Sequence, residues 1–308
     1  MPTGGSFRLK TGERFTAIEC TDFNLFGRYL QEGEDVVRAV LEERAAIGFN
    51  MLRVWTAYWG PPQFEAEIGR LVPAEHPEMY QRLPDFLLLC ASYGLYVELT
   101  AFTGDDIPGH WDALGAVLPD CPNVLLELVN EHGAYPSNLD PSRFQPLPGV
   151  VCSHGSSASQ AVPVRPWWHY ETSHWVNVFE WQRKTGHNSM EFCQGADALP
   201  ASHVPCLANE NTRPDQDANE MHFYDAAAGA ALLCAGSCFH SQSGKKSALF
   251  DARDRDYAEA WVNGCESVNL DYQDGRYRHA SELEGEDDLR VYQRVNPDGT
   301  RETAVIRK

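Results

Sequence analysis

Two segments of the sequence place a glutamate directly after an apolar run. The first run ends with Asn130 and Glu131, and the second, which begins at Val204, ends with Asn209 and Glu210. Two carboxylates that face each other can hydrolyse a glycosidic bond, because one protonates the leaving oxygen while the other attacks the anomeric carbon. A separation of about 5 Å gives retention of configuration, and roughly 6.5–9.5 Å gives inversion. The residue types therefore indicate a pair of catalytic glutamates.

The elements that carry these residues are short apolar runs that alternate with longer amphipathic stretches, which is the pattern of βαβ units. The expected strands are residues 15–23, 50–55, 95–100, 124–130, 150–153, 168–171, 204–209 and 237–240. The expected helices are residues 34–47, 77–93, 111–118, 177–184, 225–235 and 255–262. Eight strands in alternation with helices predict an α/β fold, a closed (β/α)8 TIM barrel in preference to an open doubly wound sheet.

The chain is expected to form a catalytic barrel over residues 1–265 and a C-terminal extension over residues 266–308. A small hairpin around Thr11 and Gly12 precedes the first strand. In the extension, two strand-like runs flank the turn sequence Asn296-Pro297-Asp298-Gly299, which predicts a β-hairpin packed on the barrel. Residues 134–148 hold four prolines and are expected to form a long loop.

Arg53 lies inside an apolar strand, where a charge is costly unless it is paired. An interior ion partner is therefore expected. Glu127 alternates with apolar neighbours in its own strand and is the expected partner, as a structural residue of the interior. Catalytic side chains of such barrels project from the carboxyl ends of strands, where Glu131 and Glu210 would meet.

These residues together resemble glycoside hydrolase clan A, and within it the cellulase- and mannanase-like barrels of family 5. The resemblance rests on Asn130-Glu131, on the later Glu210, and on Arg53 in the strand 50–55. The opening segment from Phe7 resembles the N-terminal hairpin of that family, which extends the match to most of residues 7–262.

The resemblance implies that Glu131 is the acid/base and Glu210 the nucleophile. Asn130 would bind the 2-hydroxyl of the sugar, and Arg53 would keep Glu210 ionised through its positive charge. The implied activity is that of a retaining β-glycosidase that acts on glucan- or mannan-like material and needs no cofactor.

The resemblance also suggests a tyrosine that orients the nucleophile, and Tyr170 is the candidate. His169 competes for that role because the facing of the strand is uncertain by one residue. The sequence departs from the family in two places: Asn211 and Thr212 follow the nucleophile instead of an aromatic residue and a glycine, and the tryptophan of strand eight is missing, with His240 the nearest candidate.

Other residues compete for these roles or add to them. Glu191, between Met190 and Phe192, is a rival nucleophile, but it lies at the end of an expected helix, whereas Pro205 gives Glu210 the better strand register. Several aromatic residues follow expected strands, where their faces could stack on sugar rings. These are Tyr58, Trp59, Trp111, Trp167 and Trp168.

Composition restricts the partners. The formal net charge of −19 argues against nucleic acid and anionic membranes, since both would repel the chain. The resemblance implies carbohydrate as the partner. No run approaches a membrane span, and the N-terminus has no signal-peptide core. Nine scattered cysteines without a CxxC pair predict reduced thiols and a cytoplasmic protein, or a secreted one if a signal was removed; Cys234 and Cys238 are the one pair to check.

Two alternative functions stay open at this point. One is a catalytically silent barrel that binds carbohydrate, which the unusual residues after Glu210 favour. The other is a divalent-metal sugar isomerase that uses Glu131, His132, His169 and Glu210. The sequence has no HExxH motif and no His-x-His after the first strand, so no metal site is predicted. The sugar, the linkage and the oligomeric state do not follow from the sequence.

Overall fold

The structure is a computed structural model that forms two compact units. The first unit comprises residues 1–18, 173–241 and 251–308, and the second comprises residues 19–172 and 242–250. The structure describes residues 7–59, 65–66, 68–103, 105–132, 139–157, 169–174, 205–209, 219–233, 235–268, 281–283, 289–295 and 301–307. The expected helix 177–184 lies outside these residues, as do Cys234, Glu191 and Glu210.

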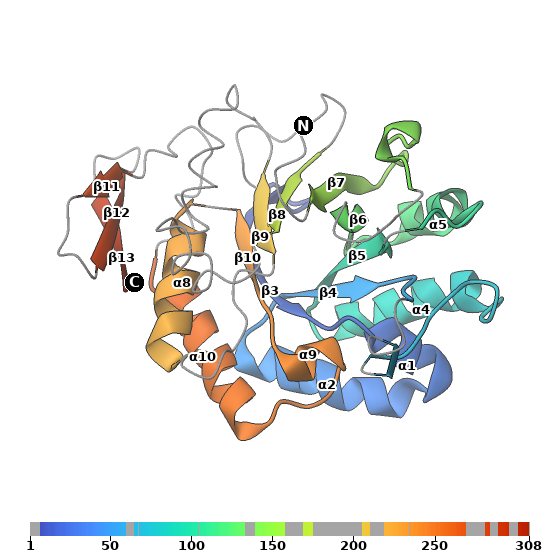
Figure 1. The fold of residues 1–308 in the computed structure, drawn as a ribbon, viewed down its shortest axis with the longest axis horizontal. Coiled ribbons are helices and arrows are strands. Elements are labelled where there is room, and N and C mark those ends of the chain that lie inside the picture. The colour runs from blue at the N-terminus through green and yellow to red at the C-terminus, as the bar shows by residue number, and fades with distance from the viewer. Residues whose placement is uncertain are drawn as a thin grey trace. The chain divides into compact units, whose positions relative to one another are not determined.

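Strands and helices alternate along most of the described chain (Figure 1). The strands are β1 (Phe7–Arg8), β2 (Arg14–Phe15), β3 (Ala17–Thr21), β4 (Met51–Trp55), β5 (Tyr96–Phe102), β6 (Val124–His132), β7 (Val151–Ser157), β8 (Glu171–His174), β9 (Cys206–Asn209), β10 (Gly236–Phe239), β11 (Ser281–Leu283), β12 (Leu289–Val295) and β13 (Arg301–Arg307). The helices are α1 (Leu25–Gln31), α2 (Glu34–Ile47), α4 (Met79–Ser92), α5 (His110–Val117), α8 (Glu220–Leu233), α9 (Gln242–Lys245) and α10 (Ala252–Glu266). The alternation predicted from the sequence is confirmed.

The sheet of the second unit is parallel, with strand order β7-β6-β5-β4-β3. In the sequence, α1 and α2 lie between β3 and β4, α4 lies between β4 and β5, and α5 lies between β5 and β6, because parallel neighbours need a crossover connection. The helix 34–47 predicted from periodicity is α2, which buries Val37, Val40 and Leu41 along one side. Gly48 ends α2 in the left-handed conformation (φ 112°), and its N–H donates to the carbonyls of Arg44 and Ala45 in the last turn.

The two faces of this sheet differ in chemistry because side chains alternate along each strand. Leu52, Val54 and Leu99 belong to an apolar face. Such a face needs a covering layer, and α1 and α4 contribute one through Phe26 and Phe86, whose ring centroids are 5.2 Å apart. The opposite face, which we call the polar face, carries the side chains of Arg53, Glu98, Thr100 and Glu127, all fully buried. Strand register places Arg53 beside Glu98 and Thr100 beside Glu127.

The first unit contains the parallel pair β9–β10, and the N–H of Ala17 at the start of β3 donates to the carbonyl of Ala235 just before β10. Helices α8 and α10 approach closely at Gly264, where a Cβ would overlap the carbonyl oxygen of Tyr224. Phe223 on α8 stacks on Tyr257 of α10 with ring centroids 4.4 Å apart. β12 and β13 form the predicted antiparallel hairpin. β11 pairs with the other edge of β12, and β13 runs beside α8. The boundary predicted after residue 265 stays a prediction.

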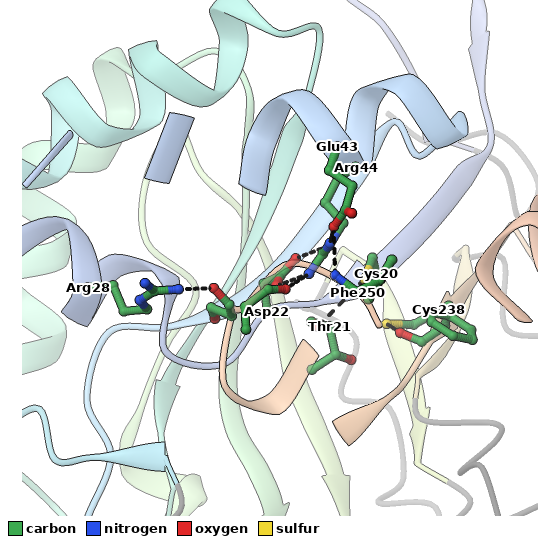
Figure 2. Close-up of polar contacts among 11 residues, drawn as sticks. Cys20, Thr21, Asp22, Arg28, Glu43, Arg44, Cys238 and Phe250 are labelled. Carbon is green, nitrogen blue, oxygen red and sulfur yellow. Dashed lines mark hydrogen bonds and ion pairs between the residues drawn. The ribbon is translucent and has the colours of Figure 1, made fainter. Parts of the chain in front are cut away.

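A segment that follows β10 belongs to the second unit, and we call residues 242–250 the clasp. Arginine and glutamate side chains of α1 and α2 hold its backbone (Figure 2). Arg28 donates to the carbonyl of Ser247 (2.5 Å), and Arg44 donates to the carbonyl of Ala248 (2.7 Å). Glu43 accepts the N–H of Phe250 at 2.9 Å. The clasp is therefore fixed to residues about 200 positions earlier in the chain.

The buried centre of these contacts is the ion pair of Arg44 with Asp22 (Figure 2). Two guanidinium nitrogens lie 3.0 Å from the two carboxylate oxygens, which is the bidentate geometry of a strong charged pair. Arg44 also contacts Glu43 and lies over the ring of Phe250, 3.5 Å from its centroid. Burial raises the pKa of Asp22 to about 6, although the charge of Arg44 acts to lower it.

Several elements differ from their predicted bounds. The expected strand 168–171 is observed as β8, which begins at Glu171, with Tyr170 forming an isolated bridge to Ser153. β7 is longer than the expected strand 150–153 because it continues beside the extended end of β6. The short helices α1 and α9 were not predicted. Among the described residues, no helix is long and apolar enough to cross a membrane. Cys20, Cys90, Cys121, Cys152 and Cys265 are free thiols.

Candidate active site

The carboxyl end of β6 carries two residues predicted to act in catalysis. Asn130 and Glu131 lie in the last three positions of this strand. The side chain of Asn130 is described, whereas Glu131 is described by its backbone alone. Glu210 would follow directly after Asn209, the last residue of β9. The assignment of Glu131 and Glu210 as the catalytic pair stays a prediction.

The end of β6 contains a β-bulge. Val129 pairs with Gly155 of β7 and His132 pairs with Ser157, so β6 advances three residues while β7 advances two. Asn130 and Glu131 of β6 therefore lie opposite the single residue 156 of β7. Bulges of this kind redirect side chains and are frequent beside active sites.

The bulge changes the side of the sheet on which Asn130 lies. Regular alternation would place Asn130 on the face opposite to Glu127. Instead, Oδ1 of Asn130 accepts a hydrogen bond from Nη2 of Arg53 (2.9 Å), the same nitrogen that binds Glu127. Asn130 therefore lies on the polar face, directly before the predicted acid/base.

Gly155 makes this bulge possible. Its φ is +88°, a conformation that L side chains rarely adopt. A Cβ at this position would overlap the carbonyl oxygen of Val129 and lie 3.0 Å from its carbonyl carbon. Only glycine allows the two strands to approach so closely beside Asn130.

Arg53 is the cation of the polar face. Its Nη2 lies 2.5 Å and its Nε 3.2 Å from Oε2 of Glu127, and its Nε lies 3.4 Å from Oε2 of Glu98. The guanidinium carbon also lies 4.5 Å from the ring centroid of Trp55. The expectation that Arg53 has an interior ion partner, and that Glu127 is that partner, is confirmed. The further expectation that Arg53 keeps Glu210 ionised concerns a residue outside the described part of the chain.

Glu127 of β6 forms hydrogen bonds to residues of three other strands. Besides Arg53 of β4, it accepts hydrogen bonds from the hydroxyl of Thr100 on β5 (2.8 Å) and from that of Thr172 on β8 (2.9 Å). Both carboxylate oxygens of Glu127 therefore accept hydrogen bonds, which offsets the cost of burying this polar group.

Glu98 is the second carboxyl group beside Arg53, and its surroundings shift its pKa. Burial raises the pKa of Glu98 well above its usual range, and the nearby Glu19 and Glu127 raise it further, while Arg53 acts in the opposite direction. The hydroxyl of Tyr170 donates to Oε1 of Glu98 at 2.7 Å. Glu98 therefore holds a proton to a higher pH than an exposed glutamate would, and it adds less negative charge to the polar face.

Of His169 and Tyr170, only Tyr170 lies on the polar face. Tyr170 is 1% exposed and points to Glu98, so it lies on the polar face. The ring of His169 lies elsewhere, because its Nδ1 accepts the N–H of Cys152 at 3.0 Å, and burial lowers its pKa. Of these two candidates, Tyr170 is the one that the polar face contains, and its role toward the nucleophile stays a prediction.

The remaining predicted substrate contacts have varied surroundings. Trp59 is half-buried after β4. Trp111 is 6% exposed, donates its indole N–H to the carbonyl of Gln145 (3.0 Å) and packs edge-on against Phe144. His240 is buried and follows β10 in the first unit, and Trp168 lies outside the described residues. Their roles toward a sugar stay predictions.

Sequence reasoning did not single out Glu98, Thr100 and Thr172 as parts of this network. A signal for two of them was present, because Glu98 and Thr100 occupy every second position of the apolar run from Val97 to Ala101. In the part of the chain that the structure describes, no three His, Cys, Asp or Glu side chains are grouped so as to hold a metal ion.

Comparison with known proteins identifies the fold. No protein-family model matches the chain, and no curated protein matches its sequence. Among solved structures, the chain is similar to an exo-β-1,4-mannosidase from Opitutaceae bacterium strain TAV5, with a TM-score of 0.55 and 17% identity over 86% of this chain. The match covers 61% of the mannosidase, so this chain spans less than two thirds of its length.

Two further solved structures match over nearly their whole length. A β-1,4-D-mannanase from Cryptopygus antarcticus has a TM-score of 0.53 and 10% identity, over 84% of this chain and 93% of its own. A family 5 mannosidase from Rhizomucor miehei has a TM-score of 0.52 and 10% identity, over 87% of this chain and 97% of its own. The chain therefore has the α/β fold of the (β/α)8 barrels, as predicted, and resembles family 5 glycoside hydrolases at the level of fold.

Proposed function

We propose that the protein is a retaining glycoside hydrolase that cleaves β-linked mannosides. The observation that carries this proposal is the bulged end of β6, where Arg53 fixes Asn130 on the polar face directly before Glu131. A fold shared with mannosidases and mannanases supports the reaction class and suggests the mannose-containing substrate. Catalytic residues of such barrels lie at the carboxyl ends of strands, and β6 ends at this position.

In the proposed reaction, the carboxyl group of Glu131 donates its proton to the glycosidic oxygen. The carboxylate of Glu210 attacks the anomeric carbon from the other side, the bond to the leaving oxygen breaks, and a covalent glycosyl-enzyme forms. Glu131, now a carboxylate, then removes a proton from water. The water oxygen attacks the anomeric carbon as the bond to Glu210 breaks, and the proton taken from water leaves Glu131 in its original acid form, with net retention of configuration.

Asn130 would bind the 2-hydroxyl of the sugar. Because its Oδ1 accepts from Arg53, the orientation of the amide is determined, and its Nδ2 is the group that can donate to a hydroxyl. A donor held in this orientation before the substrate arrives loses little freedom on binding, and such a hydrogen bond strengthens as the transition state forms.

The proposal is tested with Glu131→Ala and Glu210→Ala on aryl β-mannosides, with aryl β-glucosides for comparison. Each variant is expected to lose most of the activity. Azide should partly restore turnover of the Glu210 variant and give a product of the opposite anomeric configuration, because a small anion can replace the missing nucleophile. Glu75→Ala, which changes an exposed glutamate paired with Arg70, is the control and should keep the wild-type rate. Near-wild-type rates in either catalytic variant would refute the assignment.

A second candidate function is a catalytically silent barrel that binds carbohydrate, which is favoured by Asn211 and Thr212 after Glu210. It predicts saturable binding of mannobiose without release of the aryl group from any aryl glycoside. A metal-dependent isomerase would instead lose its activity with a chelator and regain it with an added divalent ion.

A further inference from the structure

Hydrogen bonds among Glu127, Arg53 and Asn130 connect the interior of the second unit to the end of β6. Glu127 binds Arg53 through both Nε and Nη2, and Arg53 binds Asn130 through the same Nη2. Glu127 lies four residues before the predicted acid/base on the same strand. Arg53 of β4 therefore links two residues of β6, Glu127 in its middle and Asn130 in the bulge.

We propose that Glu127 is a positioning residue, which acts through Arg53 to hold the amide of Asn130 in the orientation that binds substrate. This inference rests on the proposed function and concerns the same site. Glu127 itself is fully buried and contacts Arg53, Thr100 and Thr172.

The charges of the polar face explain why Glu127 determines where Arg53 lies. Glu127 accepts hydrogen bonds from three side chains, and Nη2 of Arg53 lies 2.5 Å from its Oε2. Glu98 is held toward its protonated form and lies farther from the guanidinium, at 3.4 Å. The carboxylate of Glu127 is therefore the stronger attraction for Arg53, on the side of the guanidinium that faces Asn130.

Replacing this carboxylate by an amide should release Arg53 from that position. In Glu127→Gln, the side chain keeps its volume, but its negative charge is lost and one of its two acceptor oxygens becomes an NH2 group, which accepts no hydrogen bond. Glu98 is then the nearest described carboxyl group, and Arg53 should move toward it and away from Oδ1 of Asn130. A displacement of about 1 Å at a positioned group can reduce a rate by about 100-fold.

The decisive experiment is a double-mutant cycle of Glu127→Gln and Asn130→Ala, measured as kcat/KM on an aryl β-mannoside and as Kd for mannobiose. If Glu127 acts through Asn130, each single variant loses about 10- to 100-fold in kcat/KM, and the double variant loses no more than Asn130→Ala alone. Most of the loss should be in kcat, because the interaction strengthens in the transition state. Multiplicative losses in the double variant would overturn the proposal.

Two further variants separate positioning from stability. Glu43→Gln is the matched control, because Glu43 is also buried against an arginine but lies on α2. It should lower the midpoint of urea unfolding while kcat/KM changes by less than about two-fold. Thr100→Val removes one neutral donor to Glu127 at nearly constant volume and serves if Glu127→Gln does not fold. It should lower kcat/KM several-fold, and an unchanged value would also overturn the proposal.

These outcomes are distinguishable from a failure of the proposed function. A fully active Glu131→Ala variant refutes the catalytic assignment, whatever the cycle gives. An inactive Glu131→Ala variant combined with independent effects of Glu127 and Asn130 leaves the reaction in place and refutes only the positioning role. If the wild-type protein binds mannobiose without cleaving it, the same cycle in Kd decides whether Glu127 orients Asn130.

Discussion

Gly155→Ala tests whether the bulge of β6 depends on a glycine in the neighbouring strand. The substitution adds one methyl group at a position with φ of +88°, where it would overlap the carbonyl oxygen of Val129. Because this oxygen belongs to the backbone of a paired strand, it cannot move aside as the end of a flexible side chain could. The two strands must therefore separate locally, or Gly155 must change its conformation.

The expected magnitude has two parts. An alanine in the left-handed region costs about 1–2 kcal/mol. Forcing an extra methyl group into a closely packed site costs typically about 1–3 kcal/mol more. The free energy of unfolding of Gly155→Ala should therefore fall by about 2–5 kcal/mol.

Gly94→Ala is the matched control, because Gly94 has φ of +75° and an added Cβ would meet nothing within 4 Å. It should lose only the conformational part, about 1–2 kcal/mol. Urea unfolding of the two variants isolates the contact with Val129. The catalytic rate separates them further, because only Gly155→Ala disturbs the strand end that carries Asn130 and Glu131. If Gly155→Ala is no less stable than Gly94→Ala and cleaves its substrate equally fast, the bulge does not depend on this glycine.

Two other predictions concern buried polar groups of the second unit. The pKa of Asp22 in the folded protein, about 6, lies above its ordinary value of 3.8. Proton binding to Asp22 therefore stabilises the folded protein fully below about pH 3.8, and this stabilisation, about 3 kcal/mol, is lost as the pH rises through 6. Asp22→Asn should remove this slope from urea unfolding followed between about pH 4 and pH 7, and parallel pH profiles of variant and wild type would contradict it. Asn123 donates from Nδ2 to the carbonyls of Leu87 (2.8 Å) and Leu95 (3.2 Å), so Asn123→Ala should lower the free energy of unfolding by about 1–3 kcal/mol. An unchanged urea midpoint would show that these carbonyls find other donors.

The sequence predicted best those elements whose signals are local. Helix α2 was predicted over residues 34–47, as observed, because its apolar residues recur at helical spacing and Gly48 ends it. The pairing of Arg53 with Glu127 was also predicted, because a buried guanidinium in an apolar strand requires a carboxylate and Glu127 alternates with apolar residues in another strand.

The features that were not predicted depend on register between distant segments. The bulge at Asn130 requires Gly155, which lies 25 residues later, and no pattern within β6 shows that Asn130 turns to the side of Glu127. The charge state of Glu98 likewise depends on carboxylates of β3 and β6 that only the strand order brings near. The sequence did not show whether Tyr170 or His169 lies on the polar face, because a register shift of one residue exchanges the two. The hydrogen bond of Tyr170 to Glu98 decides between them.

The clasp has a consequence for the order in which the protein is made. The second unit consists of residues 19–172 together with residues 242–250, so its last part is synthesised about 70 residues after the rest. Until residue 250 has left the ribosome, Arg28 and Arg44 are without the carbonyls of Ser247 and Ala248, and Glu43 is without the N–H of Phe250. The ion pair of Asp22 and Arg44 is then still partly open to water on the side that the clasp covers. Contacts of this sequence separation form late in folding, so the second unit reaches its final stability only after most of the first unit has been translated.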